Sequence, residues 1–204
     1  MSKPIKHVFI NGMNDPTHGQ NNINRLIPFL KKYRPNDFYD TDSATYGRIG
    51  LFVSNYLWRF TWVVKIIPRI ASALVDADYC YLHSNGANFC MQALKRICNP
   101  KLKIIMLSGA LDIDYKFKQE FKTLDCYHSR NDDTVKKARL LPWSDWGSGG
   151  AYGFNSSDPR VNNIDYTKLI DGHSDWFKDG NIQIIAERIS EIYAEEQLNN
   201  MHGI

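Results

Sequence analysis

Short apolar runs alternate with longer amphipathic stretches along this chain. The clearest runs cover residues 6–10, 78–82, 103–107 and 123–127, and each is followed by polar or glycine residues. Runs of this length are typical of buried strands in a parallel sheet, and the amphipathic stretches between them are typical of covering helices. The pattern therefore predicts the α/β class, with strand and helix alternating about five times.

The amphipathic stretches predict the helices of the first half. Apolar residues at helical spacing predict a helix around Ile23–Leu30, with Pro28 in its first turn or at a kink. Residues 51–67 form an aromatic-rich stretch that also predicts a helix. Pro68 suits the start of a second short helix, which would run through Leu74.

The remaining elements are less uniform in strength. Residues 37–40 and 161–166 predict two further strands, and a helix is expected to run from Gly86 through Cys98. The final helix has the clearest pattern, because its apolar residues share one face. These residues are Ile182, Ile185, Ile189, Ile192 and Tyr193.

Size and charge narrow the class of protein. The chain has 204 residues, enough for one domain with a substantial core. Its net charge is only +3, and the basic residues are scattered without an Arg/Lys run or a zinc-finger spacing. We therefore expect no nucleic-acid partner.

The sequence also favours a cytoplasmic protein without a membrane span. The N-terminus lacks the apolar stretch of a signal peptide, and the longest apolar region, residues 49–74, is interrupted by charged residues and proline. Four cysteines occur without a C-x-x-C pair, which favours reduced core thiols over a metal site or disulfides.

Ser84 occupies a position suited to a nucleophile. The strand at 78–82 leads into His83-Ser84-Asn85-Gly86-Ala87, where a helix is expected to begin at once. A nucleophile at such a turn is held in a strained conformation at the carboxyl end of the sheet, and the helix N-terminus stabilises negative charge there. The alternative is a plain turn with Ser84 as helix N-cap. We expect the His83 side chain to point away from the site.

A serine hydroxyl needs a base that is itself oriented by a carboxylate. His173 lies in a loop between the last predicted strand and the final helix, which suits the base. Asp132 or Asp133, after the strand at 123–127, could supply the acid. We favour Asp132, with Asp133 as the N-cap of the next helix.

Acyl transfer also needs two donors for the oxyanion. The backbone amide of Asn85 is one candidate, because it directly follows Ser84. The amide of Met13 is the other, since Gly12 allows close approach of the loop after the first strand. His18 could line the same opening.

In chain order, these segments resemble a small member of the α/β-hydrolase superfamily, similar to esterases and lipases. The similarity runs from Lys6 to about Leu198, with the order Ser, Asp, His. Leu82 stands where the G-x-S-x-G pattern has its first glycine, so we expect a shifted neighbouring strand. The matching segments are Val8–Met13 for the oxyanion loop, Leu82–Gly86 for the elbow, Arg130–Val135 for the acid loop and Gly172–Ser174 for the histidine loop.

The resemblance implies a single domain over residues 1–204, with a mostly parallel sheet, helices on both faces and no large cap domain. It implies a serine esterase that acts on a small-molecule acyl substrate through an acyl-enzyme, without metal or cofactor. Trp62, Trp146 and His18 are candidate pocket residues. The alternatives are a non-catalytic binding protein of this fold and a flavodoxin-like domain, although Asp15 would sit in the phosphate loop of the latter.

Overall fold

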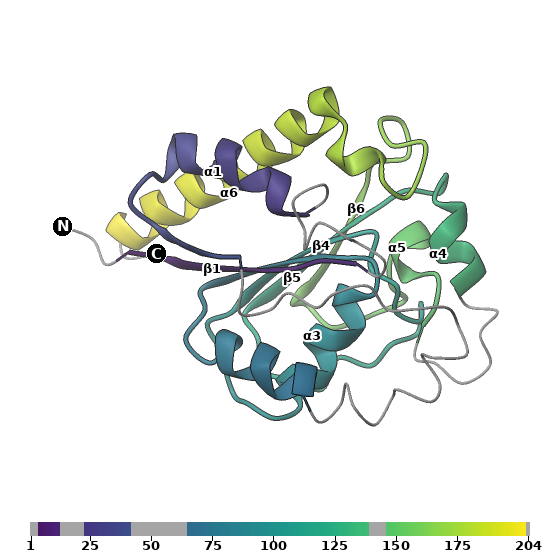
Figure 1. Cartoon of the computed structure of the whole chain (residues 1–204), viewed down its shortest axis with the longest axis horizontal. Helices are drawn as coiled ribbons and strands as arrows, with labels where there is room; N and C mark the ends of the chain where they lie inside the picture. Colours follow the sequence, from purple (N-terminus) through teal and green to yellow (C-terminus); the bar gives the residue numbers. More distant parts are fainter. Residues whose placement is uncertain (1–3, 13–22, 42–64, 139–145, 203–204) are drawn as a thin grey trace.

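The computed structural model describes residues 4–12, 23–41, 65–138 and 146–202, and in it six parallel strands form one sheet. The order across the sheet is β2-β1-β3-β4-β5-β6 (Figure 1). Because every neighbouring pair of strands is parallel, the carboxyl ends of all six strands lie on the same side of the sheet. The strands are β1 (Lys6–Ile10), β2 (Phe38–Asp40), β3 (Tyr79–His83), β4 (Lys103–Leu107), β5 (Thr123–His128) and β6 (Val161–Asp165).

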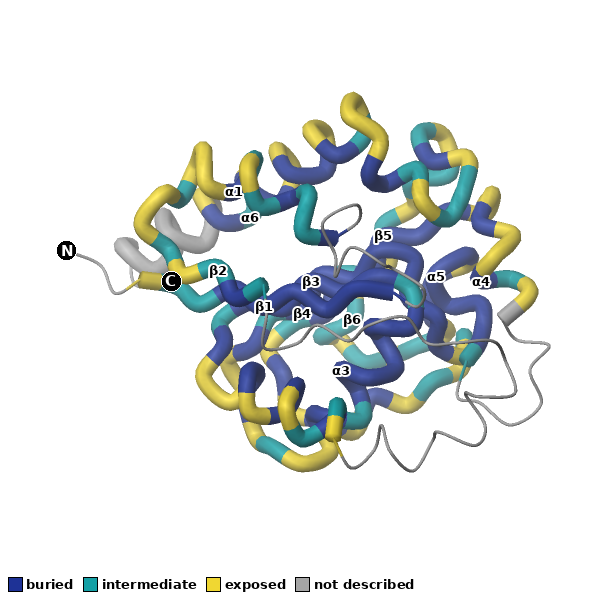
Figure 2. The backbone as a smooth tube through the Cα atoms, viewed as in Figure 1, coloured by how far each residue is buried: buried dark blue, intermediate teal, exposed yellow. Residues whose placement is uncertain are grey.

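The central strands bury both faces. In β3, Cys80 and Leu82 pack into one core cluster, and Tyr79 and Tyr81 pack into the other. Side chains of a strand alternate between faces, so nearly every residue of such a strand must be apolar or paired. The tube of Figure 2 is accordingly dark blue along the middle of the sheet.

One layer of helices covers each face of the sheet (Figure 1). The helices α1 (Ile27–Tyr33) and α6 (Asp179–His202) lie on one side, with the short turns η1 (Ile23–Leu26) and η2 (Asp175–Phe177). The helix α3 (Gly86–Leu94) and a helix over residues 65–74 lie on the other. Two short helices, α4 (Asp133–Ala138) and α5 (Gly149–Tyr152), follow β5.

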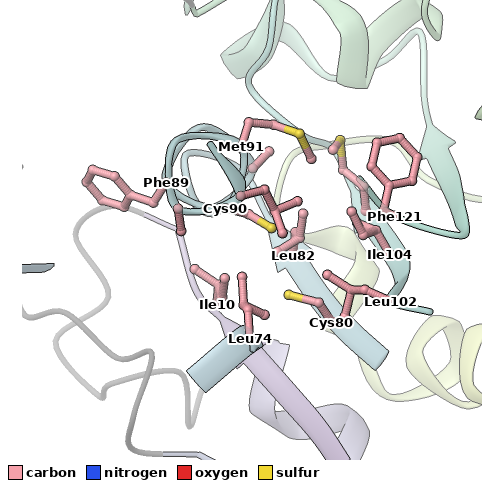
Figure 3. Close-up of a cluster of buried hydrophobic side chains, with 14 of the residues drawn as sticks. Ile10, Leu74, Cys80, Leu82, Phe89, Cys90, Met91, Leu102, Ile104 and Phe121 are labelled. Carbon is pink, nitrogen blue, oxygen red and sulfur yellow. The ribbon is translucent and has the colours of Figure 1, made fainter. Parts of the chain in front are cut away.

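The core under α3 is tightly filled with apolar side chains. Figure 3 shows Ile10, Leu82 and Ile104 of the sheet meeting Cys90 and Met91 of α3. Of these, Ile10, Leu82 and Cys90 have no exposed surface. This packing anchors α3 directly behind the turn that carries Ser84.

Most of the predicted elements are confirmed, and three details are wrong. The helix at 65–74 includes residues before Pro68, so it does not begin there. The helix α3 ends at Leu94, well before Cys98, and Cys98 is exposed. The other three cysteines are buried and all four are free. The aromatic stretch at 51–64 lies outside the described residues.

The two edge strands differ in character from the centre. The strand β2 has three residues, and β6 exposes Asn162, Asn163 and Asp165. The Asn163 amide accepts a hydrogen bond from the Phe154 N–H at 2.8 Å and donates one to the Phe154 carbonyl at 2.9 Å.

Among the helices in the described ranges, none is long and apolar enough to cross a bilayer.

Candidate active site

Ser84 adopts the strained turn expected of a nucleophile elbow. Its φ angle is +54°, a region that non-glycine residues rarely occupy. The Ser84 carbonyl accepts the Ala87 N–H at 3.2 Å and the Ala110 N–H at 2.9 Å, which fixes the turn between β3 and α3. The side chain is half-buried at the carboxyl end of the central strand.

The elbow requires two glycines in its surroundings. A Cβ on Gly86 would lie 2.5 Å from the Ile10 carbonyl oxygen, so α3 can approach β1 only with glycine there. A Cβ on Gly12 would lie 2.9 Å from the Ser84 Cβ and 3.4 Å from its Oγ. The loop after β1 therefore passes directly against the serine.

Leu82 is accommodated without the expected shift of a neighbouring strand. It pairs in regular register with Ile10 of β1 and with Met106 of β4. Its side chain is fully buried in the core under α3. A leucine at this position therefore contributes to packing, and the small residue that the turn needs is Gly86.

Asp132 and His173 come together at the carboxyl ends of the strands, where Ser84 also lies. The His173 Nδ1–H donates to Asp132 Oδ2 at 2.8 Å. Asp132 is fully buried, and the His173 side chain is 16% exposed. Burial by itself would raise the pKa of Asp132, but hydrogen bonds from His173, Val135 and Ser108 together hold that pKa below its usual value.

Asp132, not Asp133, caps the helix α4. The Val135 N–H donates to Asp132 Oδ1 at 3.0 Å, so one carboxylate serves both the helix and His173. Asp133 is the first residue of α4 and forms a 2.8 Å ion pair with Lys136 at the surface. The expectation that Asp133 would be the N-cap is therefore wrong, whereas the preference for Asp132 as partner of His173 agrees with this geometry.

Two side chains tie the acid loop to the segment that precedes His173. The Ser129 hydroxyl donates to the Ile170 carbonyl at 2.6 Å. The Asn131 amide donates to the Thr167 carbonyl at 3.1 Å and to Asp171 Oδ1 at 3.2 Å. These bonds hold the two loops together independently of the bond between Asp132 and His173.

His83 does not point away from the site as expected. Its ring lies beside that of His173, with centroids 4.6 Å apart, and it is 4% exposed. Its Nε2–H donates to the His173 carbonyl oxygen at 3.1 Å. Burial, with the nearby His173 as the next cause, lowers the pKa of His83 to about 3, so this imidazole is neutral at physiological pH.

Ser108 is a second serine in a strained conformation at the carboxyl ends of the strands. It follows β4, has a φ angle of +46° and is fully buried. Its Oγ accepts the Trp176 Nε1–H at 2.7 Å. The sequence analysis does not single out Ser108, although a serine directly after the strand next to that of Ser84 is a signal that could have identified it.

Of the other five predicted site residues, the structure describes Asn85 and Trp146. Asn85 is buried at the start of α3, where its carbonyl accepts the Asn88 N–H at 3.0 Å. Trp146 is half-buried, and the glycine that follows it packs against Asp112. Met13, His18 and Trp62 lie outside the described residues.

The described residues offer no group of histidine, cysteine or carboxylate side chains that could hold a metal ion.

A cleft of about 660 Å³ opens beside Leu94, Tyr115 and Gln119. Leu94 ends α3, whose nine residues span roughly 13 Å from the elbow, so this cleft is separate from Ser84.

No protein-family model and no curated protein matches this sequence. Among solved structures, esterase PE8 is similar with a TM-score of 0.52 and 15% identity, over 94% of each chain. A protein from Xanthomonas campestris assigned to the α/β-hydrolase superfamily has a TM-score of 0.48 and 10% identity, over 93% of this chain and 98% of that one. A YdeN-like protein from Pectobacterium atrosepticum, described as a hydrolase, has a TM-score of 0.47 and 14% identity. The alignment covers 93% of this chain and 92% of that one.

Proposed function

Because this chain has the α/β-hydrolase fold, we propose that it is a serine hydrolase that cleaves carboxylic esters through an acyl-enzyme. One observation carries the proposal. The pair of His173 and the buried Asp132, joined at 2.8 Å, lies at the carboxyl ends of the strands, where the strained Ser84 directly follows the central strand β3. An imidazole oriented by a carboxylate is what a serine hydroxyl needs in order to attack a carbonyl.

The tautomer of His173 supports its role as base. An ionised carboxylate only accepts hydrogen bonds, so Nδ1 carries the hydrogen and Nε2 is the nitrogen with the free electron pair. In the proposed reaction, Nε2 takes the Ser84 proton as Oγ bonds to the acyl carbon. The same proton then passes to the leaving alcohol, and Asp132 stabilises the imidazolium in between.

The oxyanion would be held by backbone amides. The N–H of Asn85 belongs to the first turn of α3, where the helix dipole adds to its effect. The N–H of Met13 is the proposed second donor, and the contact of Gly12 with Ser84 supports it. Water attacks the acyl carbon in the second half, with His173 again as base, and releases the acid.

The substrate is proposed to be a small-molecule ester, whose alcohol is a better leaving group than an amine. Trp62, Trp146 and His18 are the proposed walls of its pocket. Replacing Trp62 by Ala is expected to change the preference for acyl-chain length among p-nitrophenyl esters, without preventing reaction at Ser84.

A fluorophosphonate probe tests the proposal, because it reacts with activated serine nucleophiles. We expect one adduct, located by mass spectrometry on Ser84, and loss of at least about 10³-fold in ester hydrolysis for Ser84→Ala. His173→Ala should slow labelling strongly. Ser157→Ala, at an exposed serine, is the matched control and should label normally.

Failure to label any serine of the folded wild-type protein, together with no hydrolysis of short-chain esters, would reject the hydrolase. That result would leave a binding protein of the same fold. Labelling at another serine that persists in Ser84→Ala would equally reject Ser84 as nucleophile.

A further inference from the structure

His83 is a buried imidazole that the proposed reaction does not use. It ends β3, one residue before Ser84, and only 4% of it is exposed. Its ring contacts the His173 ring and also the Phe177 ring. The His83 and Phe177 rings are T-shaped, with centroids 4.8 Å apart and an interplanar angle of 87°. Burying a polar imidazole costs desolvation free energy, so a histidine at this position calls for an explanation.

The hydrogen bond of His83 defines its tautomer. A carbonyl oxygen only accepts, so the 3.1 Å contact to the His173 carbonyl places the hydrogen on Nε2. The other nitrogen, Nδ1, is then an acceptor, and it has no partner among the described residues. A Cβ on Gly12 would lie 3.1 Å from this Nδ1, so it faces the loop after β1.

The contacts of His83 join three parts of the site to one strand. Ser84 is its covalent neighbour, the His173 backbone accepts its hydrogen bond, and Gly12 lies against its Nδ1. The strand β3 is paired on both sides, to β1 and to β4, so it is a fixed reference within the sheet. His173, by contrast, lies in a loop, and a catalytic base works only when it is held within a fraction of an ångström.

We propose that His83 is a positioning residue, which sets the distance between His173 and Ser84 by binding the His173 backbone and packing against its ring. This inference rests on the proposed hydrolase function. His83 does not touch the reacting atoms in this role. It fixes the loop that delivers the base, and it does so from the residue that precedes the nucleophile.

The charge of the two imidazoles fits this division of roles. The titratable groups that act on His83 are His173 and Asp132, and Asp132 forms its hydrogen bond with His173. A second positive charge beside His173 would oppose the imidazolium that forms in the reaction. Because His83 stays neutral, only His173 takes up the proton.

Two substitutions separate the hydrogen bond from the packing. His83→Phe keeps an aromatic ring but removes the N–H, whereas His83→Gln can place an amide N–H near the position of Nε2. With p-nitrophenyl acetate, we expect kcat to fall at least 10-fold in His83→Phe with KM within about threefold, and His83→Gln to recover part of kcat. Labelling of Ser84 by the fluorophosphonate should slow in the same order.

Hydrogen exchange followed by mass spectrometry tests the inference without any activity. Amides of residues 171–177 should exchange faster in His83→Phe than in the wild type, while those of β4 keep their protection. Unchanged exchange in this segment would overturn the inference even if the wild type proves not to be a hydrolase. Equal kcat in His83→Phe and the wild type, with the wild type active, would overturn it while leaving the proposed function intact.

Discussion

Asp132 uses its two carboxylate oxygens for different purposes. Oδ1 accepts the Val135 N–H and begins α4, and Oδ2 accepts the Nδ1–H of His173. The bond to the helix thereby helps to fix the orientation of the carboxylate that binds His173. A side chain that is placed by a secondary-structure element holds its partner more precisely than one on a free loop.

Ser108 and Trp176 form a second buried polar contact at the residue scale. We expect Ser108→Ala to lower the free energy of unfolding by about 1–3 kcal/mol, because it leaves the buried Trp176 Nε1–H without its acceptor. Urea denaturation at neutral pH measures the change.

The control for this prediction is the double substitution Ser108→Ala with Trp176→Phe, which removes both partners. Its loss of stability should be smaller than the sum of the two single losses. Strictly additive losses would show that the bond between Ser108 and Trp176 contributes nothing.

The residues that sequence reasoning identified share a simple property. Ser84, Asp132 and His173 each follow a strand or a strand-and-loop in an order that can be read along the chain. The role of His83 could not be recognised this way, because it depends on which distant segment covers its face of the sheet. Alternation along β3 gives the face on which His83 lies, but not that the loop of His173 covers that face.

At the scale of elements, α3 depends on its close approach to β1. We expect Gly86→Ala to destabilise the protein by about 1–3 kcal/mol or more, since the new Cβ would meet the Ile10 and Asn11 carbonyl oxygens at 2.5 and 2.8 Å. The backbone of a central strand cannot move aside as a flexible side chain would. Thermal unfolding followed by circular dichroism measures the loss.

Gly180→Ala is the matched control, because it makes the same change in a helix without a nearby group. Gly180 lies in the first turn of α6, and a Cβ there would meet nothing within 4 Å. It should leave stability unchanged or raise it by up to about 1 kcal/mol. Equal effects at the two glycines would contradict the close packing of α3 on β1.

The elements themselves were easier to predict than their ends. Buried strands such as β4 show as continuous apolar runs, whose limits are set by the polar residues on either side. The end of α3 at Leu94 carries no glycine or proline signal, since Lys95 and Arg96 are ordinary helix formers. The local sequence therefore does not predict that the helix ends at Leu94.

At the scale of the whole molecule, buried histidines couple folding to pH. Burial lowers the pKa of His83 to about 3 and also lowers the pKa of His7, which lies between Asp37 and Tyr81. In the unfolded chain both would titrate near 6.5. Below that pH the unfolded state binds more protons than the native state, so stability is lost as the pH falls.

We therefore expect the urea midpoint to change little between pH 7.5 and pH 6.5 and then to fall down to pH 5. The contribution of His83 to the free energy of unfolding should decline by about 1.4 kcal/mol per pH unit below 6.5. Replacing His83 by Phe should reduce the pH dependence by up to that amount. The same slope in both proteins would show that His83 is not kept neutral by folding.

The edges of the sheet have a consequence for the protein in concentrated solution. An exposed edge strand offers unpaired backbone groups on which a strand of a second molecule can add. Here one edge, β2, is only three residues long, and the other, β6, exposes Asn162, Asn163 and Asp165. Short and polar edges discourage such strand addition, so the six strands of the described residues are expected to stay unextended in concentrated solution.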